Sequence, residues 1–123
     1  MIFIDTSALV DSLAGQRHSG TKLIGFLRAG EQLAISSLVL YEWLRGPRTR
    51  QELLQQENMF PREQAVGFGV AEAARAAELY KRVPRARTRE VDLAIAATAI
   101  VHDAALWTLN PEDFSDIPDL QLV

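Results

Sequence analysis

The chain has 123 residues, of which 48% are hydrophobic and 24% charged, as expected of a globular protein long enough to bury a core. It contains no cysteine, which excludes disulfides, thiolate nucleophiles and cysteine-based zinc sites. The net charge of −3 argues against a strongly basic nucleic-acid binder, although local basic patches can still act. We expect one domain over residues 1–123. No signal peptide or membrane-spanning run is evident, which favours a cytoplasmic location.

The first half of the chain alternates short apolar stretches with helical patterns. Its predicted elements are a strand over residues 2–5, helices over residues 6–14 and 18–29, and a strand over residues 32–35. Ser36 or Ser37 is suited to cap a further helix, which Gly46 would end together with the proline that follows it. A strand followed by helices and a second strand is typical of an α/β unit.

The second half continues the alternation. Its predicted elements are helices over residues 48–57, 70–83 and 90–102, a basic loop over residues 84–89, a strand over residues 105–109 and a candidate last strand over residues 120–123. In the first Ala-rich helix we expect Ala73, Ala74, Ala77 and Tyr80 to face inward. The whole pattern predicts an α/β fold with a mostly parallel sheet covered by helices on both faces.

Four carboxylates follow or lie within apolar stretches, where a buried charge is costly unless it is paired. Asp5 ends the first apolar strand, Asp113 follows the strand around Trp107, and Glu42 and Asp92 lie inside apolar helical stretches. Carboxyl ends of parallel strands meet at one edge of a sheet, where sites form. Carboxylates crowded at this edge would take up protons unless a cation neutralised their charge. Mg²⁺ or Mn²⁺ suits the purpose, because both prefer carboxylate and water oxygens and leave positions open for a phosphate.

Each acid also has a structural explanation. The stretch from Asp5 to Ser7 can start the next helix, and Glu42 can pair with Arg45 one helical turn later. Asp92 lies near a helix N-terminus, where the helix dipole favours a negative charge. The stretch NPED, which ends at Asp113, is typical of a helix start. The joint occurrence of all four acids in an alternating α/β chain favours the metal site.

Arginines gather next to two of these acids. One group follows the helix that carries Glu42, and another precedes Asp92. We predict that five of them hold a polyanionic substrate at the rim of the acidic site: Arg45, Arg48, Arg85, Arg87 and Arg89. The alternative is a pair of solvated basic surfaces.

Three stretches of the chain carry a resemblance to a known family. MIFIDTSALV, SSLVLYEWLRG and EVDLAIAATAIVHDAALWTLNPEDF resemble the PIN-domain ribonucleases, and most of all the VapC-type toxins of toxin–antitoxin pairs. The resemblance implies a three-layer α/β/α domain. It places Asp5, Glu42 and Asp92 at the three main acidic positions of the family and Asp113 at the fourth. Thr6 matches the hydroxyl beside the first acid, and Asn110 matches the polar residue before the fourth.

The resemblance also implies a function. We expect a Mg²⁺- or Mn²⁺-dependent endoribonuclease, the toxin of a type II pair, which hydrolyses RNA phosphodiesters, is inhibited by a cognate antitoxin protein and forms a homodimer. Thr6 and Asn110 would orient ligands or water around the metal-binding acids. Residues 46–89 carry no family motif. The alternatives are a PIN-like module that binds RNA or protein without cutting, and a scaffold whose acids only cap helices.

Overall fold

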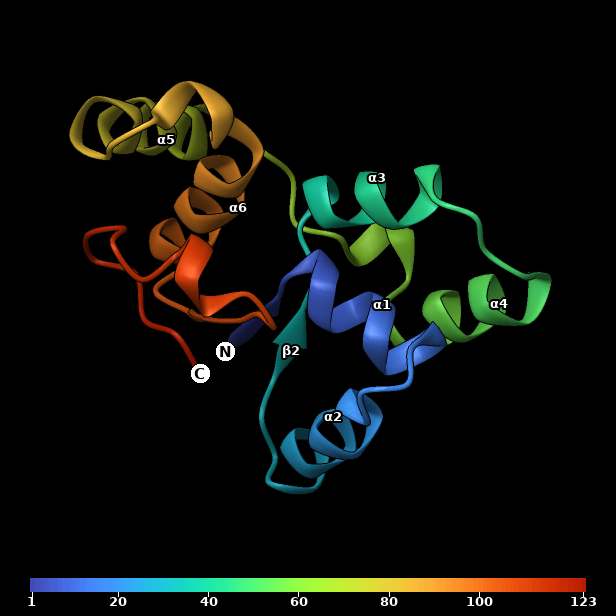
Figure 1. Cartoon of the computed structure of the whole chain (residues 1–123). Coiled ribbons are helices and arrows are strands. Elements are labelled where there is room, and N and C mark those ends of the chain that lie inside the picture. The colour runs from blue at the N-terminus through green and yellow to red at the C-terminus, as the bar shows by residue number, and fades with distance from the viewer.

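A three-stranded parallel sheet lies at the centre of the molecule. Figure 1 shows its edge strand β2 near the middle of the fold. The computed structural model describes residues 1–123 and contains strands β1 (Ile2–Ile4), β2 (Leu33–Ala34) and β3 (Ala105–Trp107) in the order β2-β1-β3. β1 is the middle strand and is buried along its whole length. The expected parallel sheet is therefore confirmed, and its central strand is the one that leads into Asp5.

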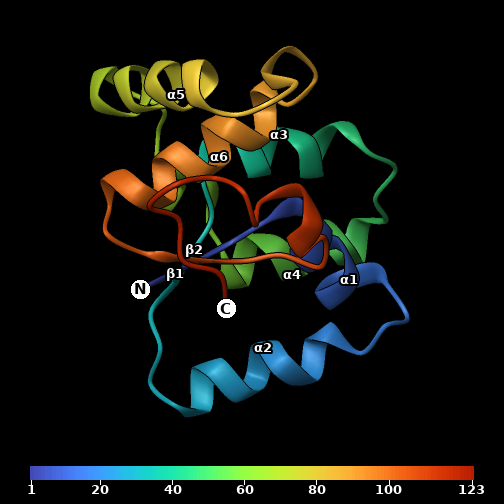
Figure 2. The same ribbon diagram turned by 60° about the vertical axis from the view of Figure 1, so that its left-hand side comes forward.

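Helices cover the two faces of the sheet. α1 (Thr6–Ala14) and α2 (Ser19–Arg28) connect β1 to β2. The connection from β2 to β3 contains α3 (Ser37–Arg45), α4 (Arg50–Met59), α5 (Val70–Arg82) and α6 (Glu90–Val101), with short 3₁₀ helices η1 (Arg62–Gln64) and η2 (Ala86–Thr88). The two crossovers run in opposite directions across the sheet, and right-handed crossovers of opposite direction cover opposite faces. Figure 2 shows α2 on one side of the strands and α5 and α6 on the other, as the predicted three-layer α/β/α architecture requires.

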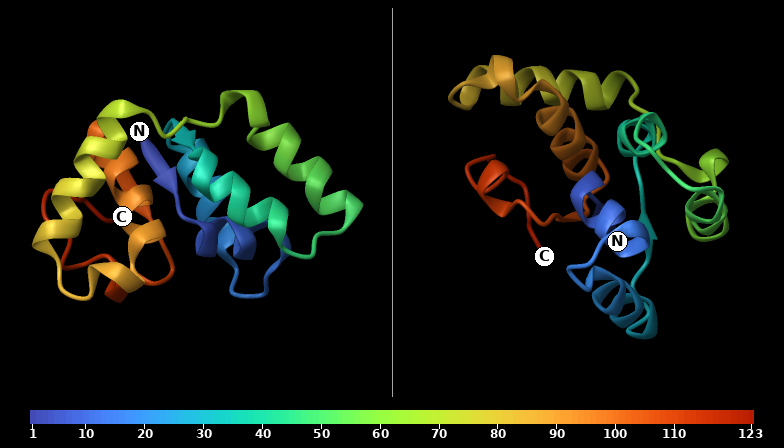
Figure 3. Two further views of the ribbon diagram at one scale, coloured as in Figure 1. Left: turned by 90° about the horizontal axis from the view of Figure 1, so that it is seen from above. Right: turned by 45° about the vertical axis from the view of Figure 1, so that its right-hand side comes forward.

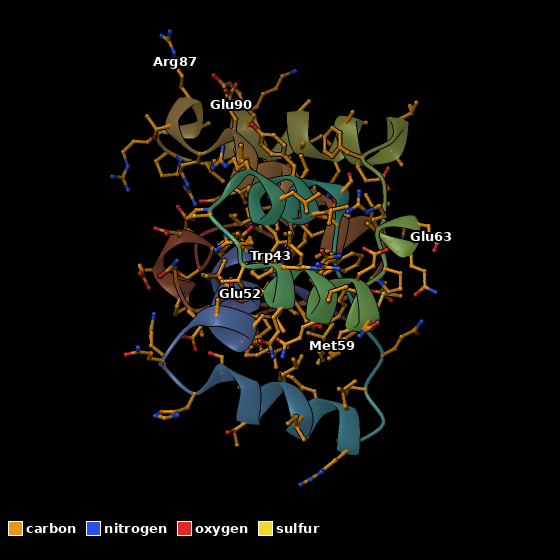
Figure 4. All side chains as sticks on the ribbon, turned by 90° about the vertical axis from the view of Figure 1, so that its right-hand side faces the viewer. Trp43, Glu52, Met59, Glu63, Arg87 and Glu90 are labelled. Atoms are coloured by element: carbon orange, nitrogen blue, oxygen red, sulfur yellow. The ribbon has the colours of Figure 1, made fainter.

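Two groups of helices lie on either side of the central strand. Figure 3 shows α5 and α6 together with the C-terminal segment on one side, and α3 with α4 on the other. Trp43 of α3 is fully buried, and Figure 4 shows it between α3 and α4. The C-terminal segment contains η3 (Pro111–Asp113) and returns to the sheet, where Leu122 forms a single parallel bridge with Leu106. The candidate last strand over residues 120–123 is therefore only this bridge. None of the helices combines the length and apolar character needed to cross a membrane.

α6 is the helix most deeply embedded in the core. Its inner residues include Ala96, Ala97 and Ala99, each with no exposed surface. Small side chains let a helix backbone lie close to its neighbours, because little volume has to be accommodated between them. This close approach brings the first turn of α6, which carries Asp92, to the carboxyl edge of the sheet.

Two expectations about the helices are wrong. α4 begins at Arg50 and not at residue 48, because Thr49 forms a capping box in which its hydroxyl accepts from Glu52 N (3.1 Å) and its own N–H donates to Glu52 Oε1 (2.8 Å). In α5 the face expected to be buried is exposed, namely Ala73, Ala74, Ala77 and Tyr80.

α5 buries a different face, which carries Glu72 and Leu79. The carboxylate of Glu72 accepts from Gly69 N (2.9 Å) and lies 3.3 Å from His102 Nε2. A buried acid is tolerated there because the start of its own helix and the histidine that directly follows α6 satisfy it. Apolar periodicity alone could not indicate this, since the residue that faces inward is charged.

Ala96→Leu tests the close packing of α6. The larger side chain has no space at a position with no exposed surface, so we expect the free energy of unfolding to fall by about 1–3 kcal/mol. The measurement is urea unfolding of the metal-free protein. Ala73→Leu, on the exposed face of α5, is the matched control and should change stability by less than about 0.5 kcal/mol. Equal small losses in both variants would contradict this account of α6.

Candidate active site

The ends of β1 and β3 lie side by side at the carboxyl edge of the sheet. Asp5 directly follows β1, and Thr108 directly follows β3. The backbone N–H of Asp5 donates to the carbonyl of Trp107 at 2.9 Å, so the two strand ends are in register. The chain leaves β1 towards β2, while β3 lies on the other side of β1. In parallel α/β sheets such a reversal opens a crevice beyond the strand ends, where sites form.

The carboxylate of Asp5 is held by two hydroxyl groups. Asp5 is only 5% exposed, and its Oδ2 accepts from Thr108 Oγ1 at 2.7 Å and from Ser7 Oγ at 3.0 Å. Asp5 precedes α1 but makes no side-chain cap bond to it, so capping does not explain the buried charge. Both hydroxyl bonds go to Oδ2 and none goes to Oδ1. The carboxylate is thus fixed in orientation with one oxygen left for another partner.

The two hydroxyls are themselves fixed by the backbone. Ser7 Oγ accepts from Leu109 N at 3.0 Å, and Thr108 Oγ1 accepts from Asn110 N at 3.0 Å. The segment after β3 is therefore tied to the start of α1 through Asp5. Sequence reasoning missed Ser7 and Thr108 as parts of the site. The available signal was hydroxyl residues just beyond both strands that end beside one another, with Ser7 two residues after Asp5 and Thr108 directly after β3.

Glu42 reaches the same edge from α3. Its Oε1 accepts from Thr6 Oγ1 at 2.6 Å, and its Oε2 lies 3.4 Å from Arg45 Nη2. The expected pairing with Arg45 is present, but the shorter and less exposed bond is the one to Thr6. Since Thr6 directly follows Asp5, this bond brings the Glu42 carboxylate towards the first acid.

Asp92 in the first turn of α6 experiences the charge of the other three acids. Its pKa is raised to about 6, first by burial and then by the charges of Asp5, Asp113 and Glu42, while Arg89 acts in the opposite direction. We call these four side chains the acidic rim. The crowding expected from the sequence is therefore present.

The acidic rim is not a closed cage of ligands. No three acidic or histidine side chains lie close enough together to hold a metal ion between them. Mutual repulsion keeps unpaired carboxylates apart, and Mg²⁺ usually binds through one or two carboxylates while keeping several waters. The arrangement suits a hydrated ion bound at the rim better than an ion enclosed by protein oxygens.

Asp113 lies on the exposed 3₁₀ turn η3, opposite the start of α6. Asn110 precedes η3 without a side-chain cap bond, and Pro111 occupies its first turn. A hollow of about 320 Å³ separates this turn from α6. Its walls are wholly polar and are formed by Arg85, Thr88, Arg89, Asp92, Glu112, Asp113 and Asp116. This hollow opens directly beside Asp92.

The five arginines expected to bind substrate have different surroundings. Arg48 lies over the Trp43 ring at 4.2 Å and donates to the Trp43 carbonyl, and Arg89 is bound to Asp116 and to two backbone carbonyls. Arg45 pairs with Glu42 and lies over the Tyr41 ring. The side chains of the remaining pair, Arg85 and Arg87, are exposed and form no hydrogen bond within the chain. Figure 4 shows Arg87 extending away from the molecule.

Comparison with known proteins identifies the family. Residues 2–120 match the family model of the PIN domain. The chain belongs to the PIN-domain family. It is 39% identical to Ribonuclease VapC19 of Mycobacterium tuberculosis over 98% of both chains. The resemblance to PIN-domain ribonucleases of the VapC type is therefore confirmed.

Several solved structures share the fold of this chain. A toxin–antitoxin complex from Klebsiella pneumoniae matches with a TM-score of 0.76 and 26% identity, over 98% of this chain and 95% of that chain. VapBC2 from Rickettsia felis, bound to a DNA fragment from the promoter, matches with a TM-score of 0.74 and 23% identity, over 100% of this chain and 98% of that chain. At the lower identity the likeness concerns the fold alone.

Asp92→Asn should stabilise the metal-free PIN domain at alkaline pH. The folded-state pKa of Asp92 lies above the ordinary value of 3.8, so the charged form is disfavoured by folding. Stability is complete below pH 4 and falls as the pH rises through about 6. We expect the variant to gain about 1–2 kcal/mol at pH 8, less than the full shift implies because the side chain is partly open to water.

Urea unfolding in EDTA at pH 4, 6 and 8 measures this gain. The advantage of Asp92→Asn should be small at pH 4, because the wild-type carboxyl is then protonated in the folded state and the pH is close to its unfolded-state pKa of 3.8. Glu90→Gln, an exposed acid in the same first turn of α6, is the control and should show no such pH dependence. A gain that is the same at all three pH values would contradict the crowding at the acidic rim.

Proposed function

We propose that this protein is a metal-dependent endoribonuclease, the toxin of a type II toxin–antitoxin pair. The observation that carries the proposal is the raised pKa of Asp92 beside Asp5, Glu42 and Asp113, in a chain of the PIN family. Burial and the charges of the other three acids disfavour the charged form of Asp92, and a cation would relieve this cost. The identity to Ribonuclease VapC19 supports RNA as the substrate.

The residues present fit Mg²⁺ or Mn²⁺. All the candidate ligands are carboxylate oxygens, which hard cations prefer, and the hydroxyls of Ser7 and Thr108 leave Oδ1 of Asp5 available. We assign the ion to Asp5, Glu42, Asp92 and Asp113, directly or through water. When bound, the ion would make a coordinated water more acidic and stabilise the charge that develops on the phosphate.

Hydroxyl side chains of this protein fix the orientation of the candidate ligands. Ser7 and Thr108 hold the Asp5 carboxylate in one orientation, and Thr6 holds Glu42. The side chain of Asn110 makes no cap bond to η3, which leaves it available to orient water or substrate at the rim. We assign no general-base role to either histidine, because His102 pairs with Glu72 after the C-terminal end of α6, the end opposite Asp92, and His18 directly precedes α2.

Cleavage of single-stranded RNA in the presence and absence of metal tests this function. We expect cleavage with Mg²⁺ or Mn²⁺ and none in EDTA. Asp5→Asn should lower kcat/KM by more than about 100-fold, because changing groups that merely surround a metal already costs 10–100-fold. Asp103→Asn removes an exposed acid outside the rim and should leave kcat/KM unchanged.

Two results would reject the enzyme proposal. Cleavage that persists in EDTA would remove the role of the metal. Tight RNA binding without cleavage under any metal condition would favour a non-catalytic PIN-like module. Mn²⁺ titration tests a third possibility, a scaffold whose acids only cap helices. Equal and negligible Mn²⁺ affinities of the wild type and Asp92→Asn would indicate such a scaffold.

Arg85 and Arg87 are proposed to guide RNA to the acidic rim. Both are free of protein partners, and Arg85 lines the hollow beside Asp92. In Arg85→Gln/Arg87→Gln we expect the affinity for single-stranded RNA in EDTA to fall about 5–10-fold, and the dependence of log K on log salt to weaken by about 1, because two phosphate contacts are lost.

Fluorescence anisotropy over a salt series provides this measurement. The matched control is Arg17→Gln/Arg28→Gln, which removes two exposed charges at the ends of α2 and should leave the slope unchanged. Mn²⁺ affinity should be unaltered in both double variants. A slope in Arg85→Gln/Arg87→Gln equal to that of the wild type would assign these arginines to the solvated surface.

A cognate antitoxin protein is the proposed partner. The similar structures from Klebsiella pneumoniae and Rickettsia felis are toxin–antitoxin assemblies, which supports the same kind of partner here. A homodimer belongs to the same proposal, and the exposed apolar residues Tyr41, Val70 and Tyr80 are compatible with it. The proposal also includes a cytoplasmic location, where RNA is available.

A further inference from the structure

Arg89 connects the two segments that carry Asp92 and Asp113. It lies three residues before Asp92, at the start of α6, and its side chain is only 12% exposed. Nη2 donates to Asp116 Oδ1 at 2.6 Å and Nη1 donates to Asp116 Oδ2 at 2.9 Å. Nη2 also donates to the carbonyl of Asp113 at 3.0 Å, and Nη1 to the carbonyl of Pro84 at 3.2 Å.

The turn held by Arg89 needs an external restraint. η3 is a single 3₁₀ turn on an exposed segment, and no side-chain cap bond stabilises its start. Asp113 on this turn raises the pKa of Asp92, which means that the two carboxylates repel each other. Repulsion would drive the turn away from α6. The contacts of Arg89 with Asp116 and the Asp113 carbonyl oppose this displacement.

The chemistry of the contact suits a positioning role. A guanidinium that binds both oxygens of one carboxylate fixes distance and orientation, whereas a lysine would supply only a point charge. The guanidinium also lowers the pKa of Asp116, so the pair stays charged at neutral pH. With its donors engaged by protein oxygens, Arg89 holds parts of the chain together and does not extend towards a substrate.

We propose that Arg89 and Asp116 form a latch that sets the separation of Asp92 and Asp113 and thereby the affinity of the acidic rim for a divalent cation. The proposal rests on the proposed function and deepens it. Arg89 and Asp116 are positioning residues in this scheme: Arg89 acts through Asp116 and the Asp113 backbone, and neither residue binds the ion or the RNA. Asp116 therefore contributes to the site although it is not one of the four acids of the acidic rim.

Mn²⁺ affinity of the full-length protein tests the latch without relying on activity. Asp116→Asn keeps the shape of a partly exposed side chain but removes the carboxylate of the ion pair, and Arg89→Gln removes the guanidinium. Each should weaken Mn²⁺ binding about 10-fold, as the loss of groups that orient ligands does. Arg89→Gln/Asp116→Asn should be no weaker than the worse single variant, because both remove the same contact. Arg89→Lys should lie between Arg89→Gln and the wild type.

A second ion pair of the same C-terminal segment provides the matched control. Arg75 Nη2 lies 2.8 Å from Asp119 Oδ2 and ties the segment to α5, away from the acidic rim. Asp119→Asn should leave the Mn²⁺ affinity unchanged even where the melting temperature in EDTA falls as much as in Asp116→Asn. In cleavage assays at saturating RNA and limiting metal, Asp116→Asn should lower kcat with little change in KM.

The outcomes separate the latch from the enzyme proposal. A wild type that cleaves RNA and binds Mn²⁺, with an Asp116→Asn variant whose Mn²⁺ affinity stays within twofold, rejects the latch alone. A wild type that neither cleaves nor binds Mn²⁺ rejects both. If Arg89 contacts RNA instead, Asp116→Asn frees the guanidinium and should tighten RNA binding while leaving Mn²⁺ affinity unchanged, which also overturns the latch.

Discussion

Negative charge concentrated at one edge of a small parallel sheet is the constraint on which the rest of the site depends. Asp5, Glu42, Asp92 and Asp113 come from four separate segments, and folding brings them near one another at a cost that the raised pKa of Asp92 makes visible. A protein selected for stability alone would replace some of these acids. The presence of all four acids is the basis on which we propose a divalent cation and phosphodiester chemistry.

Neighbouring groups hold these acids apart and in orientation. Hydroxyls of Ser7 and Thr108 bind Asp5, and the hydroxyl of Thr6 binds Glu42. Arg89 fixes the turn that carries Asp113 to the helix that carries Asp92. Each of these contacts joins two elements, so the same bonds that stabilise the edge of the sheet also orient the carboxylates. We propose that a hydrated cation is bound by this rim, which is already shaped but not closed.

The basic residues near the site divide into two kinds according to their partners. Arg48 and Arg89 are bound by protein carbonyls, an aromatic ring or a carboxylate, and they hold segments in place. Arg85 and Arg87 have no such partners and extend from the loop before α6. Arg85, Arg87 and Arg89 all precede Asp92 closely in the sequence, and only the presence or absence of a partner distinguishes a restraint from a surface available to a polyanion.

The sequence by itself determined the order of strands and helices, the parallel sheet, and the four acids, because these follow from local apolar periodicity and from residue types that are rare in apolar surroundings. Tertiary structure alone decided three other features. It placed Glu72 and not the alanine face of α5 inward, where Glu72 pairs with the histidine that directly follows α6. It recruited Thr108 to Asp5 and Asp116 to Arg89 across long separations in the chain. Such partners are invisible to local patterns, since a hydrogen bond between distant residues depends on where the whole chain places them.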